Sequence, residues 1–147
     1  MVEERIRLLG PEDYDRLVDL WQRSGLHSLR LQGRDSRRAV QQQLASGVQT
    51  ILGLEVGDRL VGAVVATHDS RKGWINRLVV DPEFRRQGYG LRLIQAAEQD
   101  LRGRGMSVIA ALVEHDNPIS LALFRKAGYV EIDPGMHYLT KRDSAEA

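Results

Sequence analysis

The chain has 147 residues, with 21 Lys and Arg against 20 Asp and Glu, and therefore a formal net charge of +1 when its histidines are neutral. A nearly balanced charge argues against a protein that binds nucleic acid through a uniformly basic surface. The sequence contains no cysteine, which excludes disulfides, zinc–thiolate sites and a cysteine nucleophile.

The length is that of one domain, residues 1–147, which can bury about two-thirds of its unfolded surface. The start of the chain, Met1–Arg5, is too charged for a signal peptide. The longest apolar stretch, around Leu60–Ala66, is far shorter than the roughly 20 residues of a membrane span. We therefore expect a cytoplasmic protein without a membrane partner, and a disordered tail at residues 143–147.

The first part of the chain shows one strand pattern and two helix patterns. Arg5–Leu9 alternates polar and apolar residues and predicts a strand, which ends at Gly10. Apolar residues then recur at helical spacing from Pro11 to Ser24. Asp35 is placed to cap a second helix over Ser36–Ala45. Residues 25–34, between the two helices, have no clear period.

The remaining elements alternate between strands and helices. Gln49–Val56 and Leu60–Thr67 are β-rich runs on either side of a hairpin signal at residues 57–59, and Trp74–Val80 is the next strand. A helix follows Gly88 and ends near residues 103–105. The last expected elements are a strand over Ser107–Val113, a helix over Asn117–Lys126, and strands over Tyr129–Ile132 and His137–Lys141. This order predicts an α+β (mixed α/β) fold with a mixed, mostly antiparallel sheet.

The segment Leu78–Gly90 joins an apolar strand to a basic turn and a helix. Amides at the start of a helix lack intrahelical acceptors and carry partial positive charge, which favours a phosphate. Gly88 and Gly90 have no Cβ and allow oxygen atoms to approach the main chain closely. Arg85 and Arg86 add charge beside these amides. The pattern is typical of a diphosphate-binding site.

Three sequence motifs that bind phosphate differ in the spacing of their residues. A P-loop ends in Gly-Lys and then Ser or Thr, but Leu91 and Arg92 follow Gly90. A dinucleotide fingerprint needs a small residue three positions after the second glycine, where Leu93 stands. What remains is an Arg/Gln-x-x-Gly-x-Gly motif after a strand that ends in Val-Asp-Pro. This motif resembles the acetyl-CoA-binding turn of the Gcn5-related N-acetyltransferase (GNAT) superfamily.

A second segment supports the resemblance. Asp116–Tyr129 places an asparagine before a helix that ends in a Gly–aromatic pair, as in the second signature of that superfamily. Two signatures at the expected separation are more specific than one, and the likeness extends over Arg5–Arg142. It implies a sheet of about seven strands that is splayed between the fourth and fifth, with about four helices around it.

The resemblance implies that acetyl-CoA is bound as a co-substrate, and no metal is expected. It implies that main-chain groups of Leu78, Val79 and Val80 hold the pantetheine arm, and that the Val80 N–H faces the thioester oxygen. The other cofactor contacts that it implies are Arg85, Arg86, Gln87, Gly88, Tyr89, Gly90, Leu91, Asn117 and Phe124. Judged from the residues alone, the strand side chains are core, the arginines are solvated, and Asn117 is a helix N-cap.

Two positions depart from the superfamily pattern. Phe124 stands where many relatives have a tyrosine that protonates the departing thiolate, although release of the thiolate costs only about 2 kcal/mol more at pH 7. Asn76 stands where many relatives have a glutamate, and it can position a water but cannot accept a proton. Glu114 is the first candidate for the base, because the superfamily's acceptor amine approaches between the diverging strands. Three histidines, His27, His68 and His115, are the other candidates.

The predicted function is therefore acetyl-CoA-dependent transfer of an acetyl group to a primary amine by direct attack in a ternary complex. The alternative, motivated by Phe124 and Asn76, is an acyl-CoA-binding or sensing domain with weak or no catalysis. The acceptor is a small-molecule amine or a protein N-terminus, and Arg30, Arg34 and Arg77 faintly favour an anionic one. No nucleic acid is expected, because no aromatic–basic platform accompanies the arginines. Some relatives pair through their last strands, which leaves a homodimer open.

Overall fold

Five strands form one sheet in the computed structural model, which describes residues 2–147. Their spatial order follows the chain: β1 (Glu4–Leu8), β2 (Gln49–Val56), β3 (Arg59–His68), β4 (Gly73–Val80) and β5 (Ile109–Ala111). β1 to β4 pair antiparallel, and β4 and β5 pair parallel. The predicted fold class, a mixed and mostly antiparallel sheet with helices, is confirmed.

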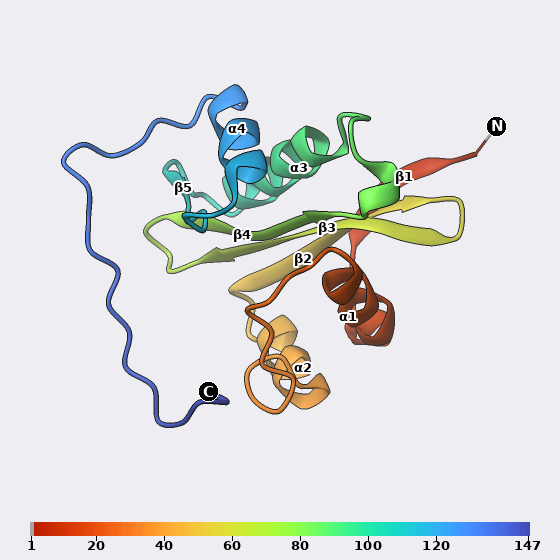
Figure 1. The fold of residues 1–147 in the computed structure, drawn as a ribbon, viewed down its shortest axis with the longest axis horizontal. Helices are drawn as coiled ribbons and strands as arrows, with labels where there is room; N and C mark the ends of the chain where they lie inside the picture. The colour runs from red at the N-terminus through yellow and green to blue at the C-terminus, as the bar shows by residue number, and fades with distance from the viewer. Residues whose placement is uncertain (1) are drawn as a thin grey trace.

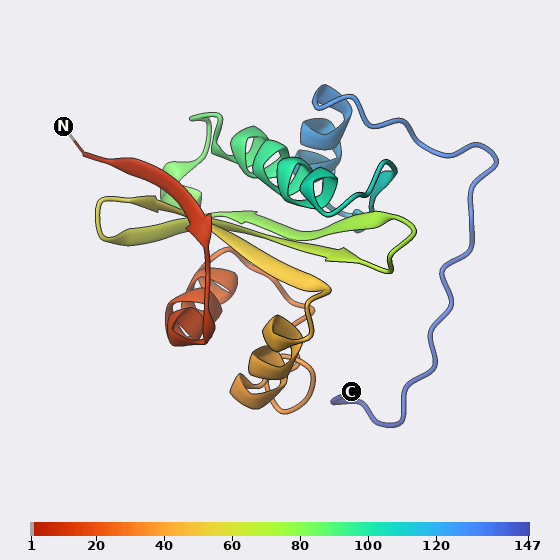
Figure 2. The same cartoon turned by 180° about the vertical axis from the view of Figure 1, so that it is seen from behind.

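Helices cover both faces of the sheet, as Figure 1 and the reverse view in Figure 2 show. α1 (Tyr14–Arg23) and α2 (Arg37–Ala45) lie on one face. α3 (Tyr89–Gly103) and α4 (Pro118–Lys126) lie on the other. Two short 3₁₀ turns, η1 (Pro11–Asp13) and η2 (Pro82–Phe84), precede α1 and follow β4. None of the helices within residues 2–147 is both long and apolar enough to cross a membrane.

The sheet is buried on both faces, which explains why β2 and β3 read as nearly continuous apolar runs. Val64 belongs to the core under α3, together with Leu93 and Ile94. Its neighbours Ala63 and Val65 belong to the core under α1, together with Leu20 and Trp21. Successive side chains of a strand point to opposite faces, so β2, β3 and β4 each supply both cores.

The beginnings of the first two helices differ from the prediction. The first helical segment starts as the 3₁₀ turn η1 and becomes α-helical at Tyr14. Ser36, rather than Asp35, caps α2, because the Ser36 Oγ accepts a hydrogen bond from the Ala39 N–H at 3.2 Å. Asp35 is buried and binds Arg77 instead.

The C-terminal part of the chain differs most. The strand predicted over Ser107–Val113 comprises only Ile109–Ala111. The strands predicted over Tyr129–Ile132 and His137–Lys141 are wrong, since the described chain after α4 has neither helix nor strand. It runs along the outside of the molecule towards α2 (Figure 1), where Arg34 donates a hydrogen bond to the Ala147 carbonyl oxygen at 2.9 Å. The sheet of residues 2–147 therefore has five strands instead of about seven.

Candidate active site

β4 and β5 separate after a short contact. Gly73, Trp74 and Ile75 face Ile109, Ala110 and Ala111 in three paired positions. The rest of β4, residues 76–80, has no partner in β5. The predicted splay between the fourth and fifth strands is therefore present, and it leaves one edge of residues 76–80 open. We call this unpaired edge of β4, on the side of β5, the opening.

A β-bulge follows Asn76, the residue after the last β4 position that pairs with β5. Ala63 faces Val79 and Val65 faces Asn76, so that Arg77 and Leu78 together lie opposite Val64. Arg77 has a φ of +50°, a left-handed conformation that costs a residue with a Cβ about 1 kcal/mol or more. A bulge bends its strand and re-aims the side chains around it.

The hydrogen bonds to β3 show which main-chain groups of β4 face the opening. The Asp81 N–H donates to the Val61 carbonyl oxygen at 2.7 Å, so the main chain of Asp81 faces β3. Because these groups alternate along a strand, those of Val79 also face β3, and those of Leu78 and Val80 face the open edge. Arg85 Nε reaches the outward Val80 carbonyl oxygen at 3.3 Å. The Val80 N–H is therefore directed into the opening.

The turn after β4 presents main-chain amides without protein acceptors. Arg86 and Gly88 have φ values of +64° and +79°, and Gly88 is the N-cap of α3. Within residues 2–147, the amides of residues 87–91 have no hydrogen-bond acceptor, and the first bond of the helix runs from the Arg92 N–H to the Gly88 carbonyl oxygen at 3.2 Å. Arg85 and Arg86 are exposed beside them. Amides at a helix start and in a left-handed turn form an anion-binding concavity.

Asp81 fixes the start of this turn. Its carboxylate accepts hydrogen bonds from the Glu83 N–H at 2.9 Å and pairs with Arg23 of α1, also at 2.9 Å. Burial raises the pKa of Asp81, but the hydrogen bonds from Glu83 and Arg23 outweigh it and hold this pKa below its ordinary value. The turn is thereby tied to α1 on the other face of the sheet.

The first residues of α3 also have packing roles. Tyr89 is buried, and its hydroxyl donates a hydrogen bond to the Glu4 carboxylate, which raises the pKa of Tyr89. A Cβ at Gly90 would lie 2.8 Å from Leu123 Cδ1, so glycine at this position lets α3 and α4 approach closely. Nothing in the sequence around Tyr89 indicates its contact with β1.

Asn117 and Phe124 have clear structural roles. The Asn117 Oδ1 accepts a hydrogen bond from the Ser120 N–H at 3.1 Å, which confirms the predicted N-cap of α4. Phe124 is 5% exposed and meets Tyr129 edge to face, with ring centroids 5.1 Å apart. Its ring therefore belongs to the core under α3 and α4.

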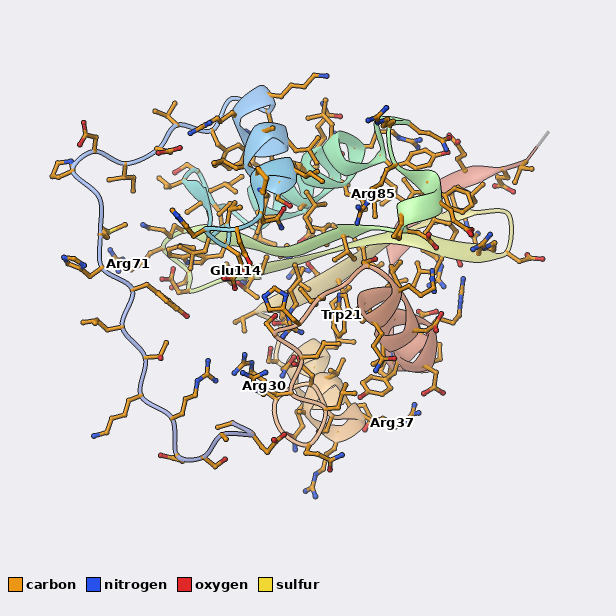
Figure 3. The ribbon with its side chains drawn as sticks, viewed as in Figure 1. Trp21, Arg30, Arg37, Arg71, Arg85 and Glu114 are labelled. Atoms are coloured by element: carbon orange, nitrogen blue, oxygen red, sulfur yellow. The ribbon has the colours of Figure 1, made fainter. Side chains whose placement is uncertain are left out.

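Two candidates for proton transfer, Asn76 and Glu114, lie on opposite sides of the opening. Asn76 is half-buried on β4, with its Nδ2 3.5 Å from Thr67 Oγ1. Glu114 follows β5; its side chain is exposed, and its carbonyl oxygen accepts a hydrogen bond from the Asn117 N–H at 3.0 Å. Figure 3 shows Arg85 beside the start of α3 and Glu114 at the end of β5. His68 is the last residue of β3, and its Nδ1 accepts a hydrogen bond from the Ser70 N–H at 3.1 Å.

Arg77 does not supply a free positive charge for an anionic acceptor. Its Nη1 and Nη2 donate to the two carboxylate oxygens of Asp35 at 2.6 and 2.9 Å. Its guanidinium lies 4.9 Å from the centroid of the Trp21 ring. Sequence reasoning missed this pair, because Asp35 stands where a helix cap is expected. Among residues 2–147, no cluster of acidic and histidine side chains is arranged to hold a metal.

Known structures share this fold. The PaiA N-acetyltransferase from Thermoplasma acidophilum, in complex with coenzyme A, has a TM-score of 0.78 at 20% identity, over 89% of this chain and 92% of its own. The aminoglycoside N-acetyltransferase AAC(6')-Iy, in complex with the bisubstrate analogue CoA-S-monomethyl-acetylneamine, has a TM-score of 0.78 at 17% identity, over 95% and 99%. An aminoglycoside acetyltransferase from an uncultured soil sample, in complex with sisomicin, has a TM-score of 0.77 at 17% identity, over 95% and 97%.

These identities are low, and the structural likeness alone supports only the fold. The family is shown by the sequence, because residues 14–129, most of the chain, match the model of the acetyltransferase (GNAT) family. The matched range contains the opened part of β4, the turn before α3, and α4 with its Asn117 cap. The chain therefore belongs to the acetyltransferase (GNAT) family.

Proposed function

We propose that this protein transfers an acetyl group from acetyl-CoA to a primary amine by direct attack in a ternary complex. The observation that carries the proposal is that the open edge of β4, with the outward Val80 N–H, leads directly into the unpaired amides of residues 87–91. Acetyl-CoA carries a thioester, a pantetheine arm with two amides, and a diphosphate. One continuous surface can therefore bind all three parts.

The amides of residues 87–91 would bind the diphosphate, with Arg85 and Arg86 as the charged partners. The positive end of the α3 dipole adds to this attraction. The pantetheine arm would lie along Leu78–Val80, where its amides take the hydrogen bonds that β5 does not make. Residues 76–80 lack a β5 partner, which leaves these groups free for a ligand.

The reaction itself forms a C–N bond and breaks a C–S bond. The amine nitrogen attacks the thioester carbon, and the carbonyl oxygen becomes negative and accepts a hydrogen bond from the Val80 N–H. A single donor of this kind contributes about 3 kcal/mol. Collapse of the intermediate then releases the coenzyme as a thiolate, which takes up a proton from solvent because Phe124 has none to give.

The attacking amine must lose a proton, since a primary amine has a pKa near 10. Glu114 is the proposed base, and Asn76 is proposed to position a water between Glu114 and the amine. Asn76 lies on β4, and Glu114 lies shortly after the end of β5, where the two strands no longer pair. Their place on its two sides supports a proton path that ends in the exposed Glu114 carboxylate.

The acceptor class that we favour is a small-molecule amine, with a protein N-terminus as the second class. Two of the structurally similar acetyltransferases were crystallised with an aminoglycoside or an analogue derived from one. Neither ligand can be assigned to this chain at 17% identity. The acceptor therefore has to be found by a broad search among amines.

The test combines cofactor binding with turnover. Purified protein is titrated with coenzyme A in a calorimeter and incubated with labelled acetyl-CoA and a panel of small amines and peptides. We expect saturable binding and at least one acetylated amine. Glu114→Gln should lower kcat by about 100-fold at pH 7 and leave the Kd for coenzyme A unchanged. Glu146→Gln, at an exposed position in the C-terminal segment, is the control and should behave like wild type.

Two results would contradict the proposal. Without saturable binding of coenzyme A, the assignment of the opening would be wrong. Tight binding without any acetylated amine would favour an acyl-CoA-sensing domain. The buried Phe124, which leaves no tyrosine hydroxyl at that position, is the observation in favour of this alternative.

A further inference from the structure

Arg77 is the extra residue of the β4 bulge, and its side chain lies on the face of α1. Ile75 packs in the core under α3, so regular alternation would turn the side chain of residue 77 to that same face. The bulge turns it to the opposite face instead, where its guanidinium lies over Trp21. The side chain is only 18% exposed there.

Asp35 holds this guanidinium with both carboxylate oxygens and is itself held in place. Its Oδ2 accepts a hydrogen bond from the Arg30 N–H at 2.8 Å. Its carbonyl oxygen accepts a hydrogen bond from the Tyr14 hydroxyl at 2.6 Å. The Asp35 side chain is 5% exposed. The segment between α1 and α2, residues 24–36, is thereby bound to the sheet at the bulge.

The bulge decides which main-chain groups face the opening. Without the extra residue, Leu78–Val80 would slip by one position against β3. Because the groups alternate along a strand, such a slip would turn the Val80 N–H from the opening towards β3. The bulge requires a left-handed conformation at Arg77, which costs free energy. The pairing of Arg77 with Asp35, outside the strand, offsets this cost.

We propose that Asp35 and Arg77 are positioning residues that hold the β4 bulge, and through it the direction of the Val80 N–H. This inference rests on the proposed function, because only acetyl transfer gives that N–H its role. Neither residue touches the reacting atoms. Their pairing acts on the strand behind the opening and leaves the amides of residues 87–91 untouched.

The structure offers a matched control. Asp13 is also buried, also binds an arginine with two oxygens, Arg7 at 2.8 and 3.1 Å, and also accepts a backbone N–H, that of Gly10 at 2.9 Å. It lies at the start of α1 and makes no contact with β4 through these bonds. Asp35→Asn and Asp13→Asn therefore remove the same kind of interaction at two places.

The first readout is amide hydrogen exchange, which does not require activity. Asp35→Asn should speed exchange in residues 76–80 by about tenfold or more, whereas Asp13→Asn should speed it around residues 7–13 alone. The second readout is kinetic. Asp35→Asn should lower kcat by about 10- to 100-fold with the Kd for coenzyme A within about threefold of wild type, and Asp13→Asn should leave both unchanged.

Equal losses of kcat in the two variants, or unchanged exchange in residues 76–80 of Asp35→Asn, would overturn the inference. If Asp35→Asn does not fold, Arg77→Lys replaces it, because lysine keeps the positive charge but cannot contact both carboxylate oxygens of Asp35 in the same way. Its effects on amide exchange and on kcat should have the same direction as those of Asp35→Asn and be smaller. If the wild-type protein acetylates no amine, the proposed function fails by itself, and the exchange comparison still decides whether the pair holds β4.

Discussion

Gly88 and Gly105 both have a positive φ, the first directly before α3 and the second shortly after it. Their φ values are +79° and +93°, and a Cβ at either position would meet no atom within 4 Å. A side chain at either glycine would therefore carry the same kind of conformational cost without a clash. Only Gly88 lies among the amides that we assign to the diphosphate.

The first prediction compares Gly88→Glu with Gly105→Glu. Both substitutions should lower the free energy of unfolding by about 1–2 kcal/mol, because both force a left-handed conformation on a residue with a Cβ. Gly88→Glu should also weaken binding of coenzyme A by at least about 100-fold, since a carboxylate would occupy the anion site. Urea denaturation and calorimetry measure the two effects. Equal affinity in the two variants would refute the assignment of the turn.

The second prediction concerns the strain at Arg77. Arg77→Ala and Arg77→Gly both leave Asp35 buried without its partner, at a cost of about 3 kcal/mol. Glycine adopts a φ of +50° freely and alanine does not. Arg77→Gly should therefore be more stable than Arg77→Ala by about 1 kcal/mol in urea denaturation. The opposite order would mean that residue 77 is not left-handed in solution.

The third prediction concerns the pH dependence of stability. A hydrogen bond from Arg7, followed by those from Arg16 and Arg5, lowers the pKa of the buried Glu55 to about 2, against an ordinary value of 4.5. Since this pKa is depressed in the folded state, the ionised carboxylate stabilises the fold above about pH 4.5. That contribution, on the order of 3 kcal/mol, is lost as the pH falls from about 4.5 to about 2.

Glu55→Gln should therefore lower the free energy of unfolding at pH 7 and flatten its dependence on pH below about 4.5. The exposed Glu3→Gln should change neither quantity. Denaturation at several pH values provides the measurement. An identical acid dependence in wild type and Glu55→Gln would show that the arginines around Glu55 do not act as described.

The fourth prediction tests the place of Phe124. Phe124→Leu keeps an apolar side chain but loses the edge-to-face contact with Tyr129, which should cost about 1–2 kcal/mol of stability. Affinity for coenzyme A should stay within about twofold of wild type, because the ring lies in the core. A large loss of affinity at unchanged stability would instead make Phe124 a cofactor contact.

Much of the fold and the candidate turn could be predicted because their signals are local. The period of apolar residues located β2, β3, β4 and α3, and the glycines and arginines between β4 and α3 identified the turn. Asp35 and Ser36 are residue types that cap helices equally well. Asp35 binds Arg77, which lies 42 residues further along the chain, and Ser36 therefore caps α2. A single sequence does not show that choice.

The spacing of apolar residues in β4 indicates the bulge. Ile75 and Leu78 pack on the same face of the sheet although they are three residues apart instead of two. The last two predicted strands failed for a different reason. Their alternation describes a strand with one buried face, but a strand also needs an edge with which to pair, and periodicity carries no information about that edge.

β5 meets its neighbour over three positions, whereas β2 and β3 pair over eight. On our proposal, the pantetheine arm occupies the vacant length as an additional, non-peptide strand. Occupancy of the site and integrity of the sheet would then be thermodynamically linked, with about 2.7 kcal/mol gained when the ligand is at 100 times its Kd. The loaded protein should accordingly melt at a higher temperature and resist proteolysis near β5 and α4.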